Sequence, residues 1–488
     1  MTTRIARPIG LMLIAVAGLA RDAAGEPLPA FSSLSAEQQA AMRKAVAPPP
    51  LHQRRNPYST PMYYPMWGSG SPDGKPHPEW QEALAKDWAE LGMTKIHFYA
   101  YPQGNDPSSR CYNLTDASRE GIRNFLRACQ RHSLKIGLRV DLPCTVNNSK
   151  GHPTADYWIA HPNNPANELK AYFRWLDDLV TLLKGRVEYL ILGDEIEWKD
   201  GSDPRAWNAE VYLKFFKPAA EVVHRADPAI KVSMYSASPA RWREVLGLVK
   251  SGYAQHGDAV AINHYDYKVL KRLKDDLGKA SPDKKLLFLS NGVGYIACDT
   301  PERNPPKDGY ARYNDMDQAA MIARTMYAWW DMDADVAPYY ISMRAMVYRG
   351  KRTPHWYGFF GFMDFIIDEQ DRASIHHYPG WFAYQTVAQV FHDRDAFSEP
   401  AFAVEAEPAP EYLNAHERKG KELVVICWGT GGTKLRIASK AYAYPVQINL
   451  LDYRKWSDIP GESDGNGVTL TDVPLARAPT IIRLVAKP

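Results

Sequence analysis

Hydrophobic positions change period in a regular cycle from about residue 60 to residue 391. Short apolar runs, typical of buried strands, alternate with stretches in which apolar residues recur every three or four positions, as on one face of a helix. The predicted strands cover residues 62–67, 95–101, 134–141, 187–193, 230–235, 259–264, 285–290 and 337–342, and the predicted helices cover residues 78–91, 116–132, 168–183, 211–225, 240–252, 315–331 and 381–391. Strands that alternate with helices form a parallel sheet, and eight strands favour a (β/α)8 TIM barrel, an α/β fold. An open doubly wound sheet is the alternative.

The pattern changes after residue 391, where three prolines precede strand-like runs with no helical stretch between them. These runs cover residues 422–428, 434–438, 446–451, 468–470 and 480–485. Short strands separated by glycine-rich turns predict a small antiparallel β-sandwich. The expected organisation is a signal peptide (1–25), an irregular lead-in (26–57), a barrel of the catalytic type (58–394) and a β-sandwich accessory domain (395–488).

The first residues are typical of a secretory signal peptide. Arg4 and Arg7 precede an apolar run over residues 9–19, which small residues follow. That run is short for a membrane-spanning helix, and no later stretch approaches the required length of about 20 residues. We therefore expect a secreted or periplasmic protein with no integral membrane segment after signal removal; a retained N-terminal anchor is the alternative.

Composition narrows the classes of partner. The chain has 488 residues, which exceeds the roughly 250–300 at which single cores stop growing, so two structural units are expected. A net charge of +3 gives no electrostatic reason to expect a nucleic-acid partner. The five cysteines lack the spacing of zinc or redox motifs, so no metal and no cofactor are expected, and one disulfide such as Cys111 to Cys144 stays open.

The residues that end the predicted strands are mostly aromatic or acidic. In a (β/α)8 barrel the active site lies at the carboxyl ends of the strands. Tyrosine and tryptophan rings stack on sugar rings, while carboxylates and amides bind hydroxyl groups. The predicted substrate-binding residues are Trp67, Tyr99, Asp141, His264, Tyr265, Asp266, Asn291, Tyr340 and Arg344. This rim indicates an oligo- or polysaccharide substrate; an inward-facing Arg344 would indicate an acidic or sulfated sugar, and its alternative role is an ion pair with Asp194 or Asp266.

These motifs resemble the clan A glycoside hydrolases, which are exported retaining enzymes on a (β/α)8 barrel and often carry a β-sandwich accessory domain. The clearest segment is residues 185–195, Gly-Arg-Val-Glu-Tyr-Leu-Ile-Leu-Gly-Asp-Glu, which is similar to the family's fourth strand and its Asn-Glu ending. Residues 357–359 and 378–384 are similar to the family's barrel close. The resemblance implies a glycoside hydrolase that degrades a polysaccharide or oligosaccharide, with Glu195 as general acid/base.

The residues themselves support a special role for Glu195. Burial in an aromatic pocket and a like charge on Asp194 would both raise the pKa of Glu195, as a general acid requires. The alternative is that Asp194, Glu195 and Glu197 are solvated loop carboxylates or salt-bridge partners.

Two positions depart from the family pattern. Asp194 stands where the family has asparagine, and Gly292 stands where its nucleophilic glutamate on strand seven is expected. Neither Gly292 nor Asn291 can form a glycosyl ester, so the two-carboxylate retaining mechanism is not supported. Three routes remain: an inverting mechanism, assistance by a substrate acetamido group, or a catalytically inactive carbohydrate-binding pseudoenzyme. The candidate bases for inversion are Asp141, Asp266 and Asp299, and Asn291 or Asp194 could orient an assisting group.

Overall fold

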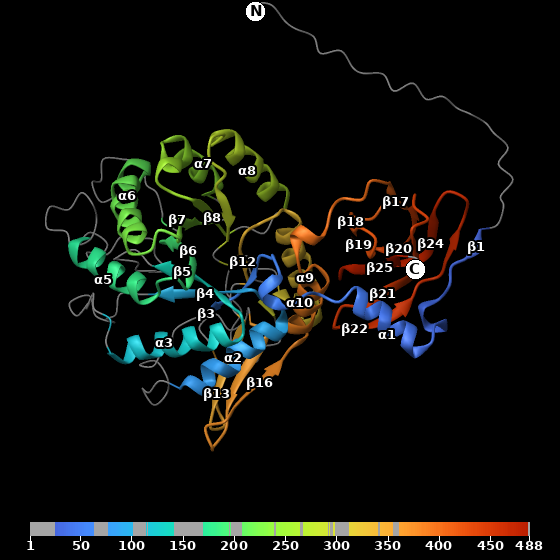
Figure 1. Ribbon diagram of the computed structural model, residues 1–488, viewed down its shortest axis with the longest axis horizontal. Coiled ribbons are helices and arrows are strands. Elements are labelled where there is room, and N and C mark those ends of the chain that lie inside the picture. The colour runs from blue at the N-terminus through green and yellow to red at the C-terminus, as the bar shows by residue number, and fades with distance from the viewer. Residues whose placement is uncertain are drawn as a thin grey trace, which may run out of the picture.

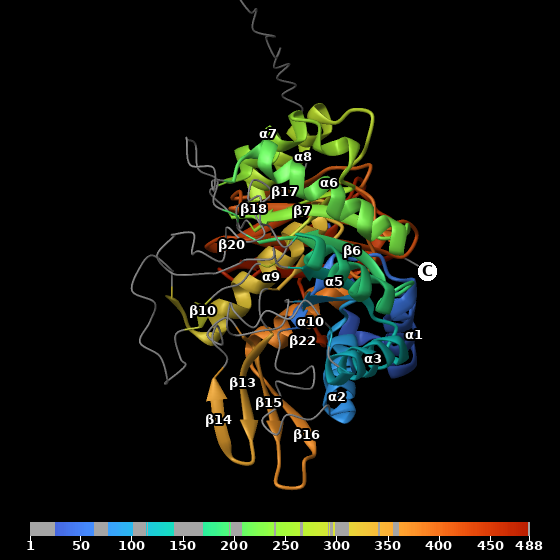
Figure 2. The same ribbon diagram turned by 90° about the vertical axis from the view of Figure 1, so that its left-hand side faces the viewer.

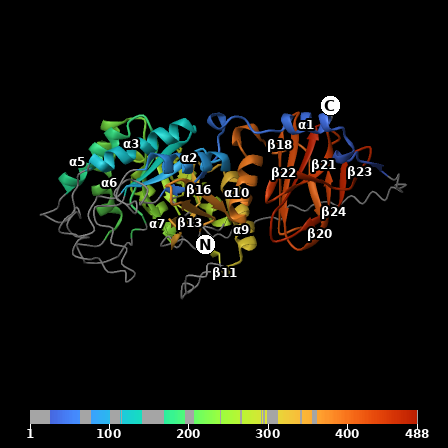
Figure 3. The same cartoon turned by 90° about the horizontal axis from the view of Figure 1, so that it is seen from below.

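The computed structural model describes residues 25–62, 77–100, 114, 116–140, 169–194, 196, 207–238, 241–263, 267–290, 292, 296–297, 312–339, 342–354 and 361–486. Two parts lie side by side in it (Figures 1 and 3). The first combines helices with a parallel sheet, and the second consists mainly of antiparallel strands. None of the helices in these ranges combines the length and the apolar character needed to cross a membrane.

A seven-stranded parallel sheet organises the first part. Its strands follow one another in sequence order: β3 (Pro61–Met62), β4 (Lys95–Ala100), β5 (Lys135–Val140), β6 (Val187–Leu192), β7 (Lys231–Ala237), β8 (Ala259–Ile262) and β9 (Leu287–Leu289). Pairing continues beyond β9, because Leu289 forms a parallel bridge with Val336. Next to Val336, β12 (Ala337–Pro338) pairs in parallel with β2 (Tyr58–Ser59), which lies directly before β3. Backbone pairing therefore connects the last strand of this series to the segment that begins it.

Helices alternate with these strands as the sequence predicted. They are α2 (Pro78–Leu91), α3 (Asp116–Arg131), α5 (Leu169–Leu182), α6 (Ala209–Ala226), α7 (Trp242–Lys250), α8 (Tyr267–Ala280), α9 (Asp315–Asp331) and α10 (Pro379–Val390). The predicted bounds of α2 and α9 are confirmed, while α8 was not predicted. Local signals explain the sharp ends of α2: a proline occupies its first turn, and Gly92 adopts the left-handed conformation (φ 98°) after its last turn.

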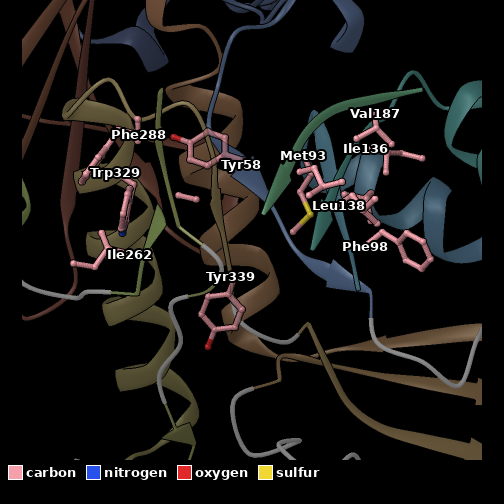
Figure 4. Close-up of a cluster of buried hydrophobic side chains, with 14 of the residues drawn as sticks. Tyr58, Met93, Phe98, Ile136, Leu138, Val187, Ile262, Phe288, Trp329 and Tyr339 are labelled. Atoms are coloured by element: carbon pink, nitrogen blue, oxygen red, sulfur yellow. The ribbon is translucent and has the colours of Figure 1, made fainter. Parts of the chain in front are cut away.

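Both faces of the parallel strands are buried, which explains their nearly continuous apolar sequences. In β6, Leu190 and Leu192 join the large core beneath the helices. Tyr189 and Ile191, which alternate with them, join a smaller cluster on the opposite face. Figure 4 shows part of the large core, in which Phe288 of β9 stacks on Trp329 of α9 with ring centroids 5.5 Å apart.

Gly137 of β5 leaves the space that the ring of Tyr189 occupies on β6. A Cβ atom at position 137 would lie 1.9 Å from Cζ of Tyr189. The ring would have to move, and its hydroxyl would lose the 2.9 Å hydrogen bond with Nδ1 of His97. We expect Gly137→Ala to lower the free energy of unfolding by about 1–3 kcal/mol, measured by urea denaturation.

The matched control for this prediction is Gly278→Ala on α8, where an added Cβ has nothing within 4 Å. Alanine favours a helix over glycine by about 0.5–1 kcal/mol, so this variant should be slightly stabilised. A Gly137→Ala protein with the urea midpoint of the wild type would contradict the close packing of the two strands.

A four-stranded sheet that the sequence pattern did not predict follows β12. Its strands lie in the order β14 (Lys351–Pro354), β13 (Met343–Tyr348), β15 (Met363–Ile367) and β16 (Ala373–His377). Figure 2 shows this sheet projecting below the rest of the molecule. It is anchored on α2, where Nε2 of His377 lies 2.6 Å from Oδ1 of Asp87.

Two five-stranded antiparallel sheets form the second part. The first has the order β18 (Tyr412–Arg418), β19 (Glu422–Trp428), β25 (Thr480–Ala486), β21 (Tyr442–Asn449) and β22 (Asp452–Asp458). The second has the order β1 (Glu26–Pro27), β23 (Gly461–Ser463), β24 (Val468–Leu475), β20 (Gly431–Ile437) and β17 (Val404–Glu407). Leu423 and Val425 of β19 share a core with Leu435 and Ile437 of β20. The predicted antiparallel strands are thus confirmed.

The sheet that contains β19 is buried on its second face as well. Val424 and Ile426 point away from the core between the two sheets and join the large core of the first part. Nearby, Tyr327 of α9 forms a 2.8 Å hydrogen bond with Nε2 of His416 on β18. The two parts therefore share apolar and polar contacts.

The lead-in over residues 26–57, which was expected to be irregular, is partly ordered on the antiparallel sheets. It contains α1 (Ala36–Ala45), which starts at a capping box formed by Ser35 and Gln38. Before α1, the ring of Phe31 lies 5.0 Å from that of Trp456, and Oδ1 of Asp458 accepts a 2.6 Å hydrogen bond from the amide of Phe31. Figure 1 shows α1 beside β21 and β22.

Candidate functional site

The carboxyl ends of β5 and β6 bring together an ion pair. Asp194 follows β6 and forms a parallel bridge with Ser236 of β7. Its Oδ2 accepts a 2.9 Å hydrogen bond from Nη1 of Arg139, the penultimate residue of β5. The side chains of Arg139 and Asp194 are only 7% and 18% exposed, so the guanidinium compensates the carboxylate in a largely dry environment.

This ion pair corrects one step of the sequence argument. Asp194 was expected to raise the pKa of Glu195 through its like charge. Since Arg139 neutralises Asp194, that repulsion is weakened.

Sequence reasoning did not identify Arg139. The signal was nevertheless present, because this arginine lies in an otherwise apolar strand, Ile136-Gly-Leu-Arg-Val140. Arginine is almost never fully buried unless it is paired. A buried cation in an apolar strand indicates that a carboxylate lies nearby.

The ring of Tyr99 on β4 packs against the guanidinium of Arg139. The guanidinium carbon of Arg139 lies 4.0 Å from the centroid of the Tyr99 ring. The residue is only 2% exposed, and His97 meets its ring edge-on at 5.2 Å. Tyr99 was predicted to contact the substrate; its burial instead makes it a support for Arg139.

The neighbouring tyrosine on β6 belongs to the same interior layer. Burial raises the pKa of the Tyr189 phenol well above its ordinary value. Tyr189 therefore stays neutral in its hydrogen bond with His97, and it contributes packing rather than charge to the interior of the sheet.

Gly292, which stands where the sequence argument expected the family's nucleophile, is held through its backbone amide. The amide of Gly292 donates hydrogen bonds to Oδ1 of Asn263 (3.2 Å) and to Oγ of Ser290 (3.1 Å). Oδ1 of Asn263 also accepts a 2.8 Å hydrogen bond from Oγ of Ser236. These contacts connect the ends of β7, β8 and β9 through neutral groups.

Arg344 forms the predicted ion pair, but with a different partner. It lies on β13, is 3% exposed, and its Nη2 donates a 2.7 Å hydrogen bond to Oδ1 of Asp315. Its guanidinium also lies 3.7 Å from the ring centroid of Tyr378. The partner is thus Asp315, where the sequence argument named Asp194 or Asp266.

Tyr378, whose ring contacts Arg344, also binds a second carboxylate. Its hydroxyl donates a 2.9 Å hydrogen bond to Oδ2 of Asp364, which also pairs with Arg352 at 3.4 Å. Burial, together with the Asp364 carboxylate, raises the pKa of Tyr378. Arginines and carboxylates thus alternate between α9 and the four-stranded sheet.

Most other predicted site residues lie outside the described part of the chain: Trp67, Asp141, Glu195, His264, Tyr265, Asp266, Asn291 and Tyr340. The same holds for Asp299, for residues 1–24 of the predicted signal peptide (1–25), and for Cys111 and Cys144. Within the described ranges, no group of three or more histidine, cysteine, aspartate or glutamate side chains is arranged to hold a metal ion.

Comparison with known proteins supports the fold. No protein-family profile and no curated sequence matches the chain. Among solved structures, a family 39 glycoside hydrolase from Bacteroides cellulosilyticus WH2 is similar with a TM-score of 0.60 and 15% identity, over 90% of this chain and 82% of that one. A family 39 β-xylosidase from Caulobacter crescentus and the family 30 subfamily 8 xylanase Xyn30A from Clostridium acetobutylicum each give a TM-score of 0.51, at 15% and 13% identity, over 90% of this chain and 97% of theirs.

At these identities the likeness concerns the fold alone. A match over 90% of the chain extends into the antiparallel sheets as well as covering the parallel one. The chain therefore has a clan A glycoside hydrolase-like fold, and the resemblance drawn from its sequence is confirmed at that level.

Proposed function

We propose that this chain is an exported glycoside hydrolase-like protein that binds an oligo- or polysaccharide at the carboxyl ends of its parallel strands, with Glu195 as general acid/base. The observation that carries the proposal is the ion pair of Arg139 and Asp194 at that edge, because Asp194 directly precedes Glu195 in the chain. The similarity of the fold to solved glycoside hydrolases supports the same reading.

The architecture that belongs to this proposal is a closed (β/α)8 barrel over residues 58–394, followed by an accessory domain over residues 395–488. Support comes from the bridge between Leu289 and Val336 and from the pairing of β12 with β2. Closure would gather the strand ends around one site, as in other barrels of this kind.

Asp194 changes what the site offers a sugar. The family's asparagine supplies both an amide donor and an acceptor, whereas an ionised aspartate supplies acceptors alone. Its Oδ2 already accepts from Arg139. Asp194 would therefore bind a sugar hydroxyl as an acceptor only.

The mechanism proposed here avoids a glycosyl ester, since Gly292 offers no carboxylate. In an inverting reaction, Glu195 protonates the leaving oxygen while Asp141, Asp266 or Asp299 removes a proton from the attacking water, which bonds to the anomeric carbon. In a substrate-assisted reaction, an acetamido oxygen attacks that carbon instead, oriented by Asn291 or Asp194.

A binding protein without activity is the second candidate. It is favoured by Gly292 itself, which has no side chain to act as a nucleophile and whose amide donates hydrogen bonds to Asn263 and Ser290. A pseudoenzyme on the same fold would retain sugar binding and lack turnover.

An assay on a panel of glycosides separates these candidates. We expect slow but measurable hydrolysis of at least one oligosaccharide, with the anomer formed first detected by proton NMR. An inverted anomer supports the water-attack route, and a retained anomer confined to 2-acetamido sugars supports substrate assistance. Saturable sugar binding by calorimetry with no turnover on the whole panel would establish the pseudoenzyme instead, and absence of both would refute the proposal.

A further inference from the structure

A cavity opens at the amino ends of the parallel strands, opposite the edge that carries Asp194. Its volume is about 560 Å³, within the range of small-molecule sites. The first residues of three strands, Lys95, Lys135 and Lys231, line it. Glu188 lies at the amino end of β6, whereas Asp194 follows its carboxyl end. Only Glu188 lines this cavity, so the cavity is separate from the proposed saccharide site.

Positive charge predominates in the wall of the cavity. Its cationic side chains are Arg54, Arg55, Lys95, Lys135, Lys231 and Arg394, and its carboxylates are Glu188, Asp333 and Asp335. Two of the carboxylates are paired, Glu188 with Lys135 and Asp333 with Arg55. The third, Asp335, accepts a 2.8 Å hydrogen bond from the amide of Phe288, and burial raises its pKa.

Three of the remaining cations use neutral acceptors. Nζ of Lys95 donates to the carbonyl of Asn56 at 3.1 Å, and Nε of Arg54 donates to the carbonyl of Pro49 at 2.8 Å. Nη1 of Arg394 donates to the carbonyl of Phe397 at 3.4 Å. Carbonyl oxygens satisfy hydrogen bonds without cancelling charge. Glu188 and Asp335 attract Lys95 at longer range, but the six cations of the wall still outnumber its three carboxylates.

Burial adds to this imbalance. It lowers the pKa of both Lys95 and Arg54, which shows that their charged forms lie in a poorly solvated environment. An anion in the cavity would offset this cost, because attraction between charges strengthens as water is withdrawn. Lys231, in contrast, is exposed, and no carboxylate of the described residues pairs with it.

We propose that this cavity binds a phosphate group, either free or carried by a small organic molecule. Several convergent cations around one concave space suit a compact multivalent oxyanion, and both arginine and lysine are common phosphate ligands. The volume leaves room for a sugar-sized group attached to the phosphate.

The experiment is calorimetric titration of the full chain with sodium phosphate and, separately, with glucose 6-phosphate. Sodium chloride at equal ionic strength is the reference. We expect saturable heat with at least one phosphate compound and none with chloride. Stronger binding of glucose 6-phosphate would assign the site to a phosphorylated metabolite, and stronger binding of inorganic phosphate would assign it to the free ion.

Lys231→Glu tests the location, because it reverses a charge at an exposed position of the wall. Binding should weaken by about ten-fold or more. The matched control is Lys271→Glu on α8, an exposed lysine that does not line the cavity. Absence of saturable binding by the wild type, or equal binding by wild type and Lys231→Glu, would overturn the proposal. Neither result depends on glycoside hydrolysis.

Discussion

Replacing Glu195 with glutamine is expected to lower kcat for glycoside hydrolysis by about 10²–10⁴-fold, the usual contribution of a general acid. Glutamine has nearly the same size as glutamate and cannot give up a proton to the leaving oxygen. The loss should be largest for natural saccharides, whose leaving groups need protonation. It should be smaller for nitrophenyl glycosides, whose leaving groups depart as stable anions.

Glu188→Gln is the matched control for this variant. Glu188 belongs to the same strand as the segment that leads to Glu195, but its carboxylate pairs with Lys135 at the amino end of the sheet. The Glu188→Gln variant should therefore hydrolyse the same substrates at the wild-type rate. Equal turnover by Glu195→Gln and wild type would remove Glu195 from the mechanism.

Replacing Arg139 with methionine is expected to lower the free energy of unfolding by about 3–5 kcal/mol, because it leaves the largely buried carboxylate of Asp194 without its cation. Methionine retains much of the packing of the arginine stem against Tyr99, so the loss reports mainly on charge. Urea denaturation measures the effect on stability, and KM measures the effect on substrate binding.

The double variant Arg139→Met with Asp194→Asn tests the same pair in the opposite direction. It removes both charges and recreates the asparagine that the clan A pattern has before its acid/base. Most of the lost stability should return, because the double variant has no buried charge that lacks a partner at this position. A double variant as unstable as Arg139→Met alone would show that the destabilisation comes from packing around Arg139 rather than from the charge of Asp194.

The regular elements of the first part could largely be predicted from the sequence. The predicted bounds 78–91 and 315–331 match those of α2 and α9. α2 buries one continuous face, whereas α9 is buried on several sides, since Trp329 packs on Phe288 of the parallel sheet and Tyr327 contacts His416 of β18. The apolar strands were equally clear, since residues such as Leu190 and Ile191 are buried on opposite faces.

Elements stabilised mainly by distant contacts were missed. In the four-stranded sheet after β12, β16 alternates half-buried and exposed residues, whereas β13 and β15 contain buried runs that are too short to be assigned from their apolar pattern. It is held by contacts such as that of His377 with Asp87, 290 residues away in the chain. The lead-in helix α1 had a readable capping box, but the neighbouring contact of Phe31 with Trp456 could not be predicted from local pattern.

For the candidate site, the sequence by itself determined the chemistry at hand: a carboxylate pair after the fourth predicted strand, an aromatic and acidic rim, and glycine in place of a nucleophile. These are properties of residue type and of the local hydrophobic period, which can be read directly from the sequence. The tertiary structure decided which groups meet. The register of β4, β5 and β6 brings Arg139 to Asp194 and places Tyr99 against Arg139, and a separate contact between β13 and α9 joins Arg344 to Asp315. Ion pairs across strands depend on register and burial, which local sequence does not specify, and so only the folded chain shows that Asp194 is neutralised beside Glu195.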